Sequence, residues 1–359
     1  MTQNVANPLE AQESFASAVV RSLPGLLAVL AVALAAYYSA PMLEKYPFFK
    51  TYLQLKDFLL AIILGIAIRN TVGVPDALQP GLRYSTLMTK TGIVVMGANY
   101  SLAGLASVGV QALVFIAVFL FGTAVVMMWI CRKLNMPTPL AACLAAGLSV
   151  CGVSATIAVA PAVRAKNEDM AYSIAVVLMF GLLALLVFPL VGRALELTPE
   201  QFGAFAGVGV VNSAQVLAAG FGYSQEAGIV AGVYNIGRVI FLPFVVLMLA
   251  IMAASSDAEV NREVAKINKL QMIIDKFPLF VLGFLAVVCM NTLGMLSKPE
   301  VKLAKTFMDW CFLLGFASIG LTTRLGDLKA AGLSGFLFGF GVAGAKAAIA
   351  LAVVLFVMS

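Results

Sequence analysis

The chain has 359 residues, of which 62% are hydrophobic and only 11% charged, and its formal net charge is +6. A mean hydropathy of +1.01 excludes a soluble globular domain, and collagen-like, disordered and disulfide-scaffold classes fit no better. The basic residues are scattered through short segments rather than clustered, so the positive charge indicates no nucleic-acid partner.

Apolar runs recur along the whole sequence, and a spanning helix needs about 20 mostly apolar residues. We therefore predict an all-α integral membrane protein with ten or eleven transmembrane helices. Residues 1–22 are polar and lack the basic start and cleavage site of a signal peptide, so we expect a short cytoplasmic segment there. The candidate runs are 23–40, 57–71, 84–100, 108–131, 138–164, 169–193, 200–219, 225–253, 277–296, 302–321 and 331–357.

Lysine and arginine in the predicted connections indicate the orientation, because cytoplasmic loops carry an excess of both. The larger set lies in alternating connections that include the N-terminal segment, which predicts a cytoplasmic N-terminus and a cytoplasmic linker at 254–276. This set is Arg21, Arg69, Arg83, Arg132, Lys133, Arg193, Arg262, Lys266, Lys269, Lys276, Arg324 and Lys329. The smaller set is Lys45, Lys50, Lys56, Arg164, Lys166, Lys298, Lys302 and Lys305.

Inside the apolar runs, cations outnumber carboxylates. Lys90, Arg238 and Lys346 lie within runs, and Asp309 is the one acidic residue in a similar position. A charge in hydrocarbon is costly and often marks a transport pathway or a binding site. The excess of cations predicts that the transported species is an anion.

The run 138–164 contains the clearest interruption, with two glycines and three hydroxyl residues between Ala146 and Thr156. Glycine tolerates unwinding, and a half-helix N-terminus attracts anions. We therefore expect a helix broken near Val150–Val153 that faces a cavity at mid-membrane depth. A packing face of small residues is the alternative. The candidate substrate ligands are Ser149, Cys151, Gly152, Ser154 and Thr156.

A second helix break is predicted at 207–215, where a polar segment follows Gly207 and Gly209. Its members Asn212, Ser213 and Gln215 need polar partners within the membrane, and a substrate cavity would provide them. Hydrogen bonds between neighbouring helices are the alternative.

The run 225–253 places Tyr234, Asn235 and Arg238 close together, because residues three and four apart are neighbours on a helix. Arg238 is the strongest single candidate for a substrate ligand, since a guanidinium binds oxyanions through two hydrogen bonds. The alternative is an arginine that extends along the helix to reach the interface.

Weaker candidates are Lys346, which small residues flank, together with Lys90, Ser318 and Asn99. Ser318 and Asn99 belong to the stretches 315–324 and 92–101, which share an apolar helix end followed by a polar patch. This likeness is a weak internal repeat.

Groups that carry enzyme or metal chemistry are missing from the sequence. Histidine is absent, and the five cysteines have no paired spacing. We find no nucleophile–base pair, no metal-spaced cluster and no nucleotide-binding loop. We therefore expect no enzyme activity, no catalytic residue, no metal and no cofactor.

Several stretches resemble the YeiH-like family of sulfate exporters. They are LLAIILGIAIRN at 59–70, PGLRYS at 80–85, AAGLSVCGVSATIAVAPAVRA at 145–165, AQVLAAGFGYS at 214–224 and GRVIFLP at 237–243. The resemblance implies a relation to sodium–proton antiporters and bile-acid symporters. It also implies a location in the bacterial inner membrane, two inverted five-helix repeats with crossing broken helices, and an elevator-type mechanism.

By the same resemblance, residues 23–359 form one transporter domain. Residues 23–56 would be an extra first helix and loop, 57–195 the first repeat and 199–359 the second. The run 302–321, broken near Ser318, Ile319 and Gly320, would pair with the broken run 138–164. The chain departs from the family where relatives commonly have a His-Asp pair and a lysine, since it has Val211, Asn212 and Asn235.

The leading hypothesis is a secondary transporter that exports or exchanges a small inorganic or organic anion. The resemblance makes sulfate or another sulfur-containing anion the expected substrate, bound between residues 149–156 and Arg238. The alternative is a cation/proton antiporter, which would use Asp309, a residue that can also be interfacial. The expected partners are the small anion, the lipid bilayer and a second copy in a homodimer.

Overall fold

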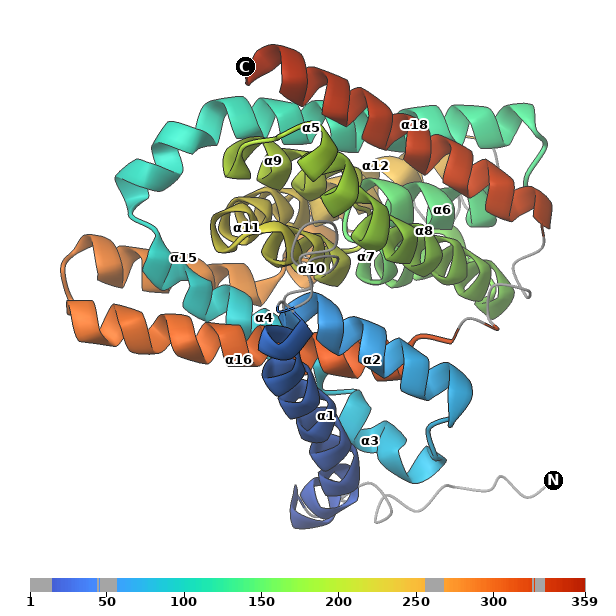
Figure 1. The fold of residues 1–359 in the computed structure, drawn as a ribbon. Coiled ribbons are helices and arrows are strands. Elements are labelled where there is room, and N and C mark those ends of the chain that lie inside the picture. Colours follow the sequence, from blue (N-terminus) through green and yellow to red (C-terminus); the bar gives the residue numbers. More distant parts are fainter. Residues whose placement is uncertain are drawn as a thin grey trace.

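The computed structural model describes residues 15–43, 45, 57–255, 268–324, 326 and 333–358, and every described element is a helix (Figure 1). The elements are α1 (Phe15–Leu43), α2 (Asp57–Thr71), η3 (Asp76–Leu78), α3 (Gln79–Leu82), α4 (Ser85–Met96), η4 (Gly97–Asn99), α5 (Leu102–Lys133), α6 (Thr138–Ser149), α7 (Val153–Val159), η5 (Ala160–Val163), α8 (Asn167–Ala194), α9 (Pro199–Gly209), α10 (Ser213–Tyr223), α11 (Gln225–Ile240), α12 (Leu242–Ala254), α14 (Lys269–Asp275), α15 (Leu279–Thr292), α16 (Lys298–Thr322) and α18 (Leu333–Val357).

Five described helices are long and apolar enough to cross a membrane, and the pair α11 and α12, bent by 45°, would make a sixth. The others are shorter than the length that spans a bilayer. The five long segments are Val20–Leu43, Ala112–Lys133, Asn167–Ala194, Lys298–Thr322 and Phe338–Val357. Many of their large apolar side chains are exposed, as expected of helices that face lipid.

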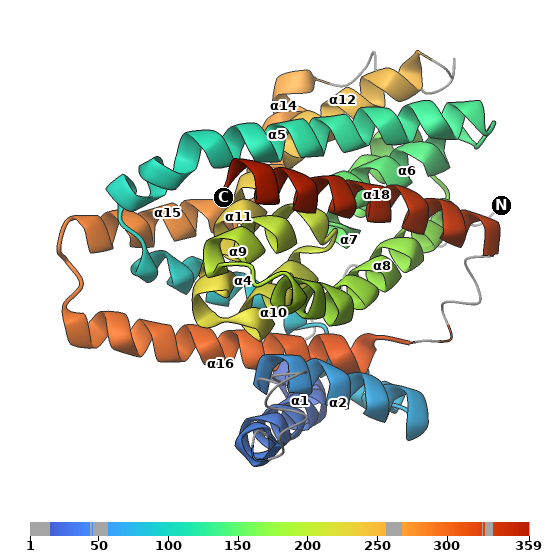
Figure 2. The same ribbon diagram turned by 45° about the horizontal axis from the view of Figure 1, so that its top comes forward.

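The helices pack into two groups. The first group, here called the scaffold, consists of α1 to α4 with α15 and α16, and α16 packs against both α2 and α4. The second group, here called the core, consists of α5 to α12 with α18. Figures 1 and 2 show the scaffold on one side of the molecule and α5 and α18 lying across the far side of the core.

Close helix packing explains the small residues near the end of α16. A Cβ atom at Gly320 would lie 2.5 Å from the carbonyl oxygen of Ile62, so only glycine lets α2 approach. The helix continues without interruption to Thr322. The predicted break near Ser318–Gly320 is therefore wrong, because these residues allow packing rather than unwinding.

The first polar interruption is a reversal of the chain. Helix α6 ends at Ser149 and α7 begins at Val153, which confirms the predicted break. The hydroxyl of Thr156 on α7 donates to the carbonyl of Cys143 on α6 at 3.3 Å, so the two helices run side by side in opposite directions. Segment 138–163 is thus a helical hairpin, here called hairpin 1.

The second polar interruption also reverses the chain. Helix α9 ends at Gly209 and α10 begins at Ser213. The ring of Tyr223, at the end of α10, stacks on Phe202 near the start of α9, with ring centroids 4.0 Å apart. The Tyr223 hydroxyl donates to the carbonyl of Leu197. Residues 199–223 form a second helical hairpin, here called hairpin 2.

These hairpins correct two expectations. The runs 138–164 and 200–219 do not cross the molecule as single spans, and the discontinuous helices do not cross each other. Their tips meet instead: a Cβ atom at Gly152 would lie 3.0 Å from the Cβ of Asn212. Irregular backbone in a membrane protein requires such an interior position, where protein or a water-filled cavity surrounds it.

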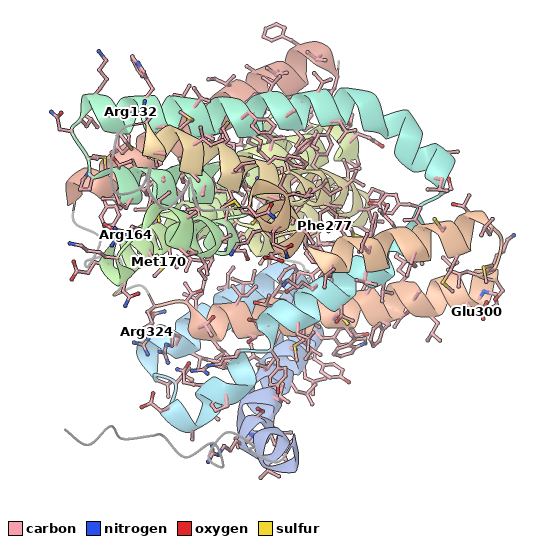
Figure 3. The ribbon with its side chains drawn as sticks, turned by 180° about the vertical axis from the view of Figure 1, so that it is seen from behind. Arg132, Arg164, Met170, Phe277, Glu300 and Arg324 are labelled. Atoms are coloured by element: carbon pink, nitrogen blue, oxygen red, sulfur yellow. The ribbon has the colours of Figure 1, made fainter. Side chains whose placement is uncertain are left out.

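The hairpins approach from opposite ends of the molecule. Figure 3 shows Arg132, Arg164 and Arg324 at one end, here called the basic end, and Glu300 at the other. Arg132 and Arg164 flank hairpin 1, which therefore enters from the basic end. Helix α8 has 28 residues and is about 42 Å long, so hairpin 2 begins at the opposite end.

Candidate functional site

A cavity of about 1060 Å³ lies between the scaffold and the core. Both hairpin tips contribute to it, together with α4, α8, α11, α12, the segment from α14 to α15 and the end of α16. Its polar and charged lining residues are Ser85, Thr86, Thr89, Lys90, Cys151, Ser154, Glu168, Tyr172, Asn212, Ser213, Asn235, Lys276, Thr322, Thr323 and Arg324. The position of Arg324 in Figure 3 shows that the cavity extends to the basic end.

The two helices of each hairpin present opposite ends at its tip. Residues at the start of α10, Asn212, Ser213 and Ala214, line the cavity, whereas Gly209 and Val210 at the end of α9 do not. Asn212, which precedes the helix, provides no side-chain cap for α10. The first N–H groups of α10 therefore give this wall of the cavity a partial positive charge.

Four buried polar atoms around this helix start have no hydrogen-bond partner: the Asn235 Nδ2, the Ser213 Oγ, the Arg238 Nε and the Gln215 Oε1. Of these residues, Asn235 and Ser213 line the cavity. The Asn235 side chain is fully buried. A buried donor without a partner costs about 1–3 kcal/mol, so its presence at a cavity wall favours a ligand that accepts hydrogen bonds.

Arg238 is buried and does not line the cavity, although it was the strongest sequence candidate. Its Nη1 donates to the carbonyl of Val210 at 2.7 Å, and its Nη2 lies 3.4 Å from the Asn235 Oδ1. Its Nε has no partner. The guanidinium therefore holds the unwound segment of hairpin 2 and the amide of Asn235.

The predicted residues divide into those on the cavity wall and those that support it. Cys151, Ser154, Asn212, Ser213, Asn235 and Lys90 line the cavity. Gly152 lies at the tip of hairpin 1 with φ +78°, a value that favours glycine. The others in the two hairpins and α11 make internal bonds or packing contacts and are absent from the wall: Ser149, Thr156, Gln215, Tyr234 and Arg238.

The weaker candidates are also mostly structural. Ser318 donates to the carbonyl of Leu82, Asn99 donates to the carbonyl of Met96, and Lys346 donates to the carbonyl of Leu148. None of the three lines the cavity. Lys90 does, and its ammonium lies 5.6 Å from the ring centroid of Phe280, which also lines it.

Sequence reasoning missed the scaffold wall of the cavity. Ser85, Thr86 and Thr89 on α4 line it, beside Lys90. Hydroxyls at spacings of three and four on an otherwise apolar helix were the available signal, since such residues share one face. Lys276 and Arg324 come from short connections, whose position no periodicity reveals.

Asp309 lies away from the cavity. Its Oδ1 accepts a hydrogen bond of 3.0 Å from the Gln225 Nε2, which joins α16 of the scaffold to α11 of the core. Within the described residues, no group of three His, Cys, Asp or Glu side chains could hold a metal ion.

An apolar seal lies next to the contact between Gln225 and Asp309. The ring of Phe221, near the end of α10, packs on Phe58 of α2 and Phe312 of α16 at centroid distances of 5.5 and 5.0 Å. Phe316 packs on Phe312 in turn. Phe221 lies eight residues, or about 12 Å, along α10 from the cavity residue Ser213. The cavity is therefore separated from the opposite end by packed aromatic rings.

Comparison with known proteins gives a consistent family. A family model described as conserved hypothetical protein 698 matches residues 24–339. A UPF0324 membrane protein of Nitratidesulfovibrio vulgaris is 79% identical over 360 residues, with all of both chains covered. A second protein of that name and organism is 35% identical over 78% of each chain, and UPF0324 membrane protein OB3406 of Oceanobacillus iheyensis is 27% identical over 88% of this chain and 89% of its own. No solved structure matches this chain.

Proposed function

We propose that this chain, which belongs to the family described as conserved hypothetical protein 698 and is a membrane protein, is a secondary transporter for a small anion. The observation that carries the proposal is the unpartnered Nδ2 of Asn235, buried in the cavity wall beside the start of α10. Donors without partners and a helix N-terminus on one wall favour an anion that accepts hydrogen bonds.

The bound anion would contact the N–H groups that open α10, the hydroxyl of Ser213 and the amide of Asn235. Ser154 and the α4 hydroxyls would complete the site from the other walls. The substrate class that we propose is a small oxyanion, with sulfate or another sulfur-containing anion as the first choice. Arg238 would act indirectly, by fixing Asn235 and the tip of hairpin 2.

The charges that line the cavity support the same substrate class. Lys90, Lys276 and Arg324 are lining residues, against the single carboxylate of Glu168 among the described lining residues. Cations that line a cavity raise the local concentration of anions and speed their arrival.

We propose that the basic end faces the cytoplasm. Because both hairpins reverse, Arg164 and Lys166 share an end with Arg132, and Arg193 moves to the opposite end. Of the described cations, Arg132, Arg164 and Arg324 lie at the basic end, and Lys133 and Lys166 are close to them in the chain. Lys298 and Lys302 are close in the chain to Glu300 at the opposite end. This distribution favours a cytoplasmic basic end and a cavity open to the cytoplasm, as export from the cell requires.

Alternating access would then need the core to move against the scaffold until the aromatic seal opens. At that seal, the described contacts between the two groups are packed aromatic rings and the bond between Gln225 and Asp309. An elevator-type movement of the core carrying both hairpin tips is the mechanism that we propose. The cation/proton antiporter has less support, since Asp309 is bound to Gln225 away from the cavity.

Reconstitution into liposomes tests the function. We expect radiolabelled sulfate or a related sulfur oxyanion to exchange across the membrane, and we expect Asn235→Ala to weaken apparent affinity about tenfold. Asn291→Ala is the matched control, because this asparagine bonds the carbonyl of Tyr100 on the scaffold. Absence of exchange and of anion-dependent thermal stabilisation across sulfate, sulfite, sulfonates and carboxylates would refute the proposal.

A further inference from the structure

Each hairpin tip is held by a buried cation from a different helix. At hairpin 2, Arg238 of α11 donates to the carbonyl of Val210 at 2.7 Å. At hairpin 1, the Lys346 Nζ of α18 donates to the carbonyl of Leu148 at 2.9 Å. Arg238 is 1% exposed and Lys346 is 4% exposed, so both side chains are inside the protein.

Both carbonyls lie at the end of the first helix of a hairpin. The last carbonyls of a helix have no partner within it and carry a partial negative charge. Leu148 is the second-last residue of α6, and Val210 directly follows α9. A cation on each therefore satisfies a buried acceptor and offsets the negative end of that helix, which leaves the positive start of α10 to face the cavity.

Helix α18 reaches both tips. Ala347 follows Lys346, and its Cβ lies 3.5 Å from the position that a Cβ at Gly209 would occupy. One turn of α18 thus contacts the end of α6 through Lys346 and the end of α9 through Ala347. Figures 1 and 2 show α18, in dark red, lying across the core.

Neither cation pairs with a carboxylate among the described residues; their hydrogen-bond partners are carbonyl and amide oxygens. A buried cation without a negative partner lowers the stability of the folded protein. A bound anion would offset this effect for Arg238 and Lys346, because it brings negative charge into the same interior.

We propose that Lys346 is a positioning residue for the anion site, the counterpart of Arg238 at the other hairpin. It does not touch the substrate: it fixes the end of α6, and with it the tip of hairpin 1, and its charge contributes to the potential that the anion meets. This proposal rests on the proposed function.

The test uses the full-length protein with Lys346→Met, which keeps the length of the side chain and removes its charge. We expect sulfate to bind about tenfold more weakly, the loss typical of a hydrogen bond to a charged group. Lys346→Arg, which keeps the charge and the donor, should stay within about threefold of wild type. Lys302→Met on exposed α16 is the matched control and should bind as wild type does.

Hydrogen exchange gives a readout that needs no anion. Lys346→Met should speed amide exchange in residues 144–153 and leave 208–216 close to wild type, whereas Arg238→Met should do the reverse. If Lys346→Met does not fold, Lys346→Gln takes its place in both measurements, because its amide donates without a charge.

The outcomes separate the two proposals. No sulfate binding by wild type would overturn the proposed function, while the exchange pattern would still decide whether Lys346 fixes hairpin 1. Wild-type affinity and unchanged exchange in an uncharged Lys346 variant would overturn the positioning role and leave the anion transporter intact.

Discussion

Asn235 is the residue on which the proposed anion site depends most directly. Its Nδ2 has no partner, and its Oδ1 lies 3.4 Å from the Arg238 Nη2. The amide therefore keeps an unpartnered donor in a residue that lines the cavity, while its oxygen accepts a hydrogen bond from the buried guanidinium. A carboxylate at this position would be a permanent counter-ion for Arg238.

We predict that Asn235→Asp abolishes anion binding and leaves the fold intact. The new carboxylate would pair with Arg238 and repel an anion at the start of α10. Thermal unfolding with and without sulfate checks this: wild type should gain stability with the anion and the variant should not. Sulfate-dependent stabilisation of Asn235→Asp equal to that of wild type would contradict the assignment of this residue.

Gln215 does not line the cavity but connects two helices that do, and its amide packs against Gly181. Its Nε2 donates to the carbonyl of Leu178 at 2.9 Å, which ties α10 to α8. A Cβ atom at Gly181 would lie 1.7 Å from the Gln215 Oε1. Any side chain at position 181 must displace the amide and break this tie.

We predict that Gly181→Ala destabilises the protein by about 1–3 kcal/mol, from overpacking and the lost hydrogen bond. Gly122→Ala on α5 is the control, because a Cβ there meets no atom within 4 Å. Denaturation of both variants gives the comparison. The double variant Gly181→Ala with Gln215→Ala should regain part of the lost stability, because the clashing amide is gone. A double variant no more stable than Gly181→Ala alone would show that the clash is with another group.

At the scale of elements, the hairpin tips determine the geometry of the site. Gly152 joins α6 to α7 with φ +78° and ψ −119°, a conformation that side chains with a Cβ avoid. The position of that Cβ is also occupied, with Val177 Cγ1 at 2.8 Å and Asn212 Cβ at 3.0 Å. The close contact of the two tips therefore requires glycine.

We predict that Gly152→Ala costs about 3 kcal/mol or more, because backbone strain and a steric clash add. Transport should be lost even where the protein remains folded, since the tips must separate. Gly294→Ala is the matched control: its φ is +70°, but nothing lies within 4 Å of a new Cβ. It should lose only about 1–2 kcal/mol, the strain alone. Equal losses in the two variants would mean that the tip contact has no part in stability.

At the scale of the whole molecule, the cavity lining reaches the basic end at Arg324. Ser154 lines the cavity and is exposed, whereas Phe221, Phe58 and Phe312 pack together toward the other end of α10. The bond between Gln225 and Asp309 is a polar contact between scaffold and core beside these rings.

We predict that Gln225→Ala weakens the seal and exposes the cavity to both ends. The measurement is labelling by a membrane-impermeant maleimide in sealed vesicles, in a variant that carries Ser154→Cys at an exposed cavity position and lacks the five native cysteines. Without the Gln225 change, labelling should come from one side only. Asp309→Asn keeps an oxygen acceptor for Gln225 and should behave like its parent. Labelling of the parent from both sides would disprove the one-sided cavity.

A further whole-molecule prediction concerns coupling. The chain has no histidine, and Asp309 lies off the cavity, so few groups there change charge between about pH 5 and 8. We expect anion binding to vary little over this range and transport to proceed by exchange, facilitated diffusion or a sodium gradient. Uptake under an imposed pH gradient, compared with a sodium gradient, is the measurement. Strong accumulation driven by pH alone would contradict this and direct attention to Lys346 and Lys90.

The sequence alone determined the membrane class, the helical fold and the two interruptions, because hydrophobicity and glycine act locally. For that reason the break at 150–152 and the polar segment at 212–215 could be predicted from the sequence. Composition also indicated an anion, through the excess of cations within apolar runs.

Only the tertiary structure decided what those residues do. A break in a helix is local, but whether the chain continues or reverses depends on distant packing, such as Tyr223 on Phe202 and Thr156 against Cys143. The sequence predicted Arg238 and Lys346 as substrate ligands because they are cations within apolar runs. In the structure each donates a hydrogen bond to a carbonyl at a hairpin tip and does not line the cavity. Asn235, and not Arg238, is among the residues that line the cavity, because the helices that surround a buried side chain come from distant parts of the chain.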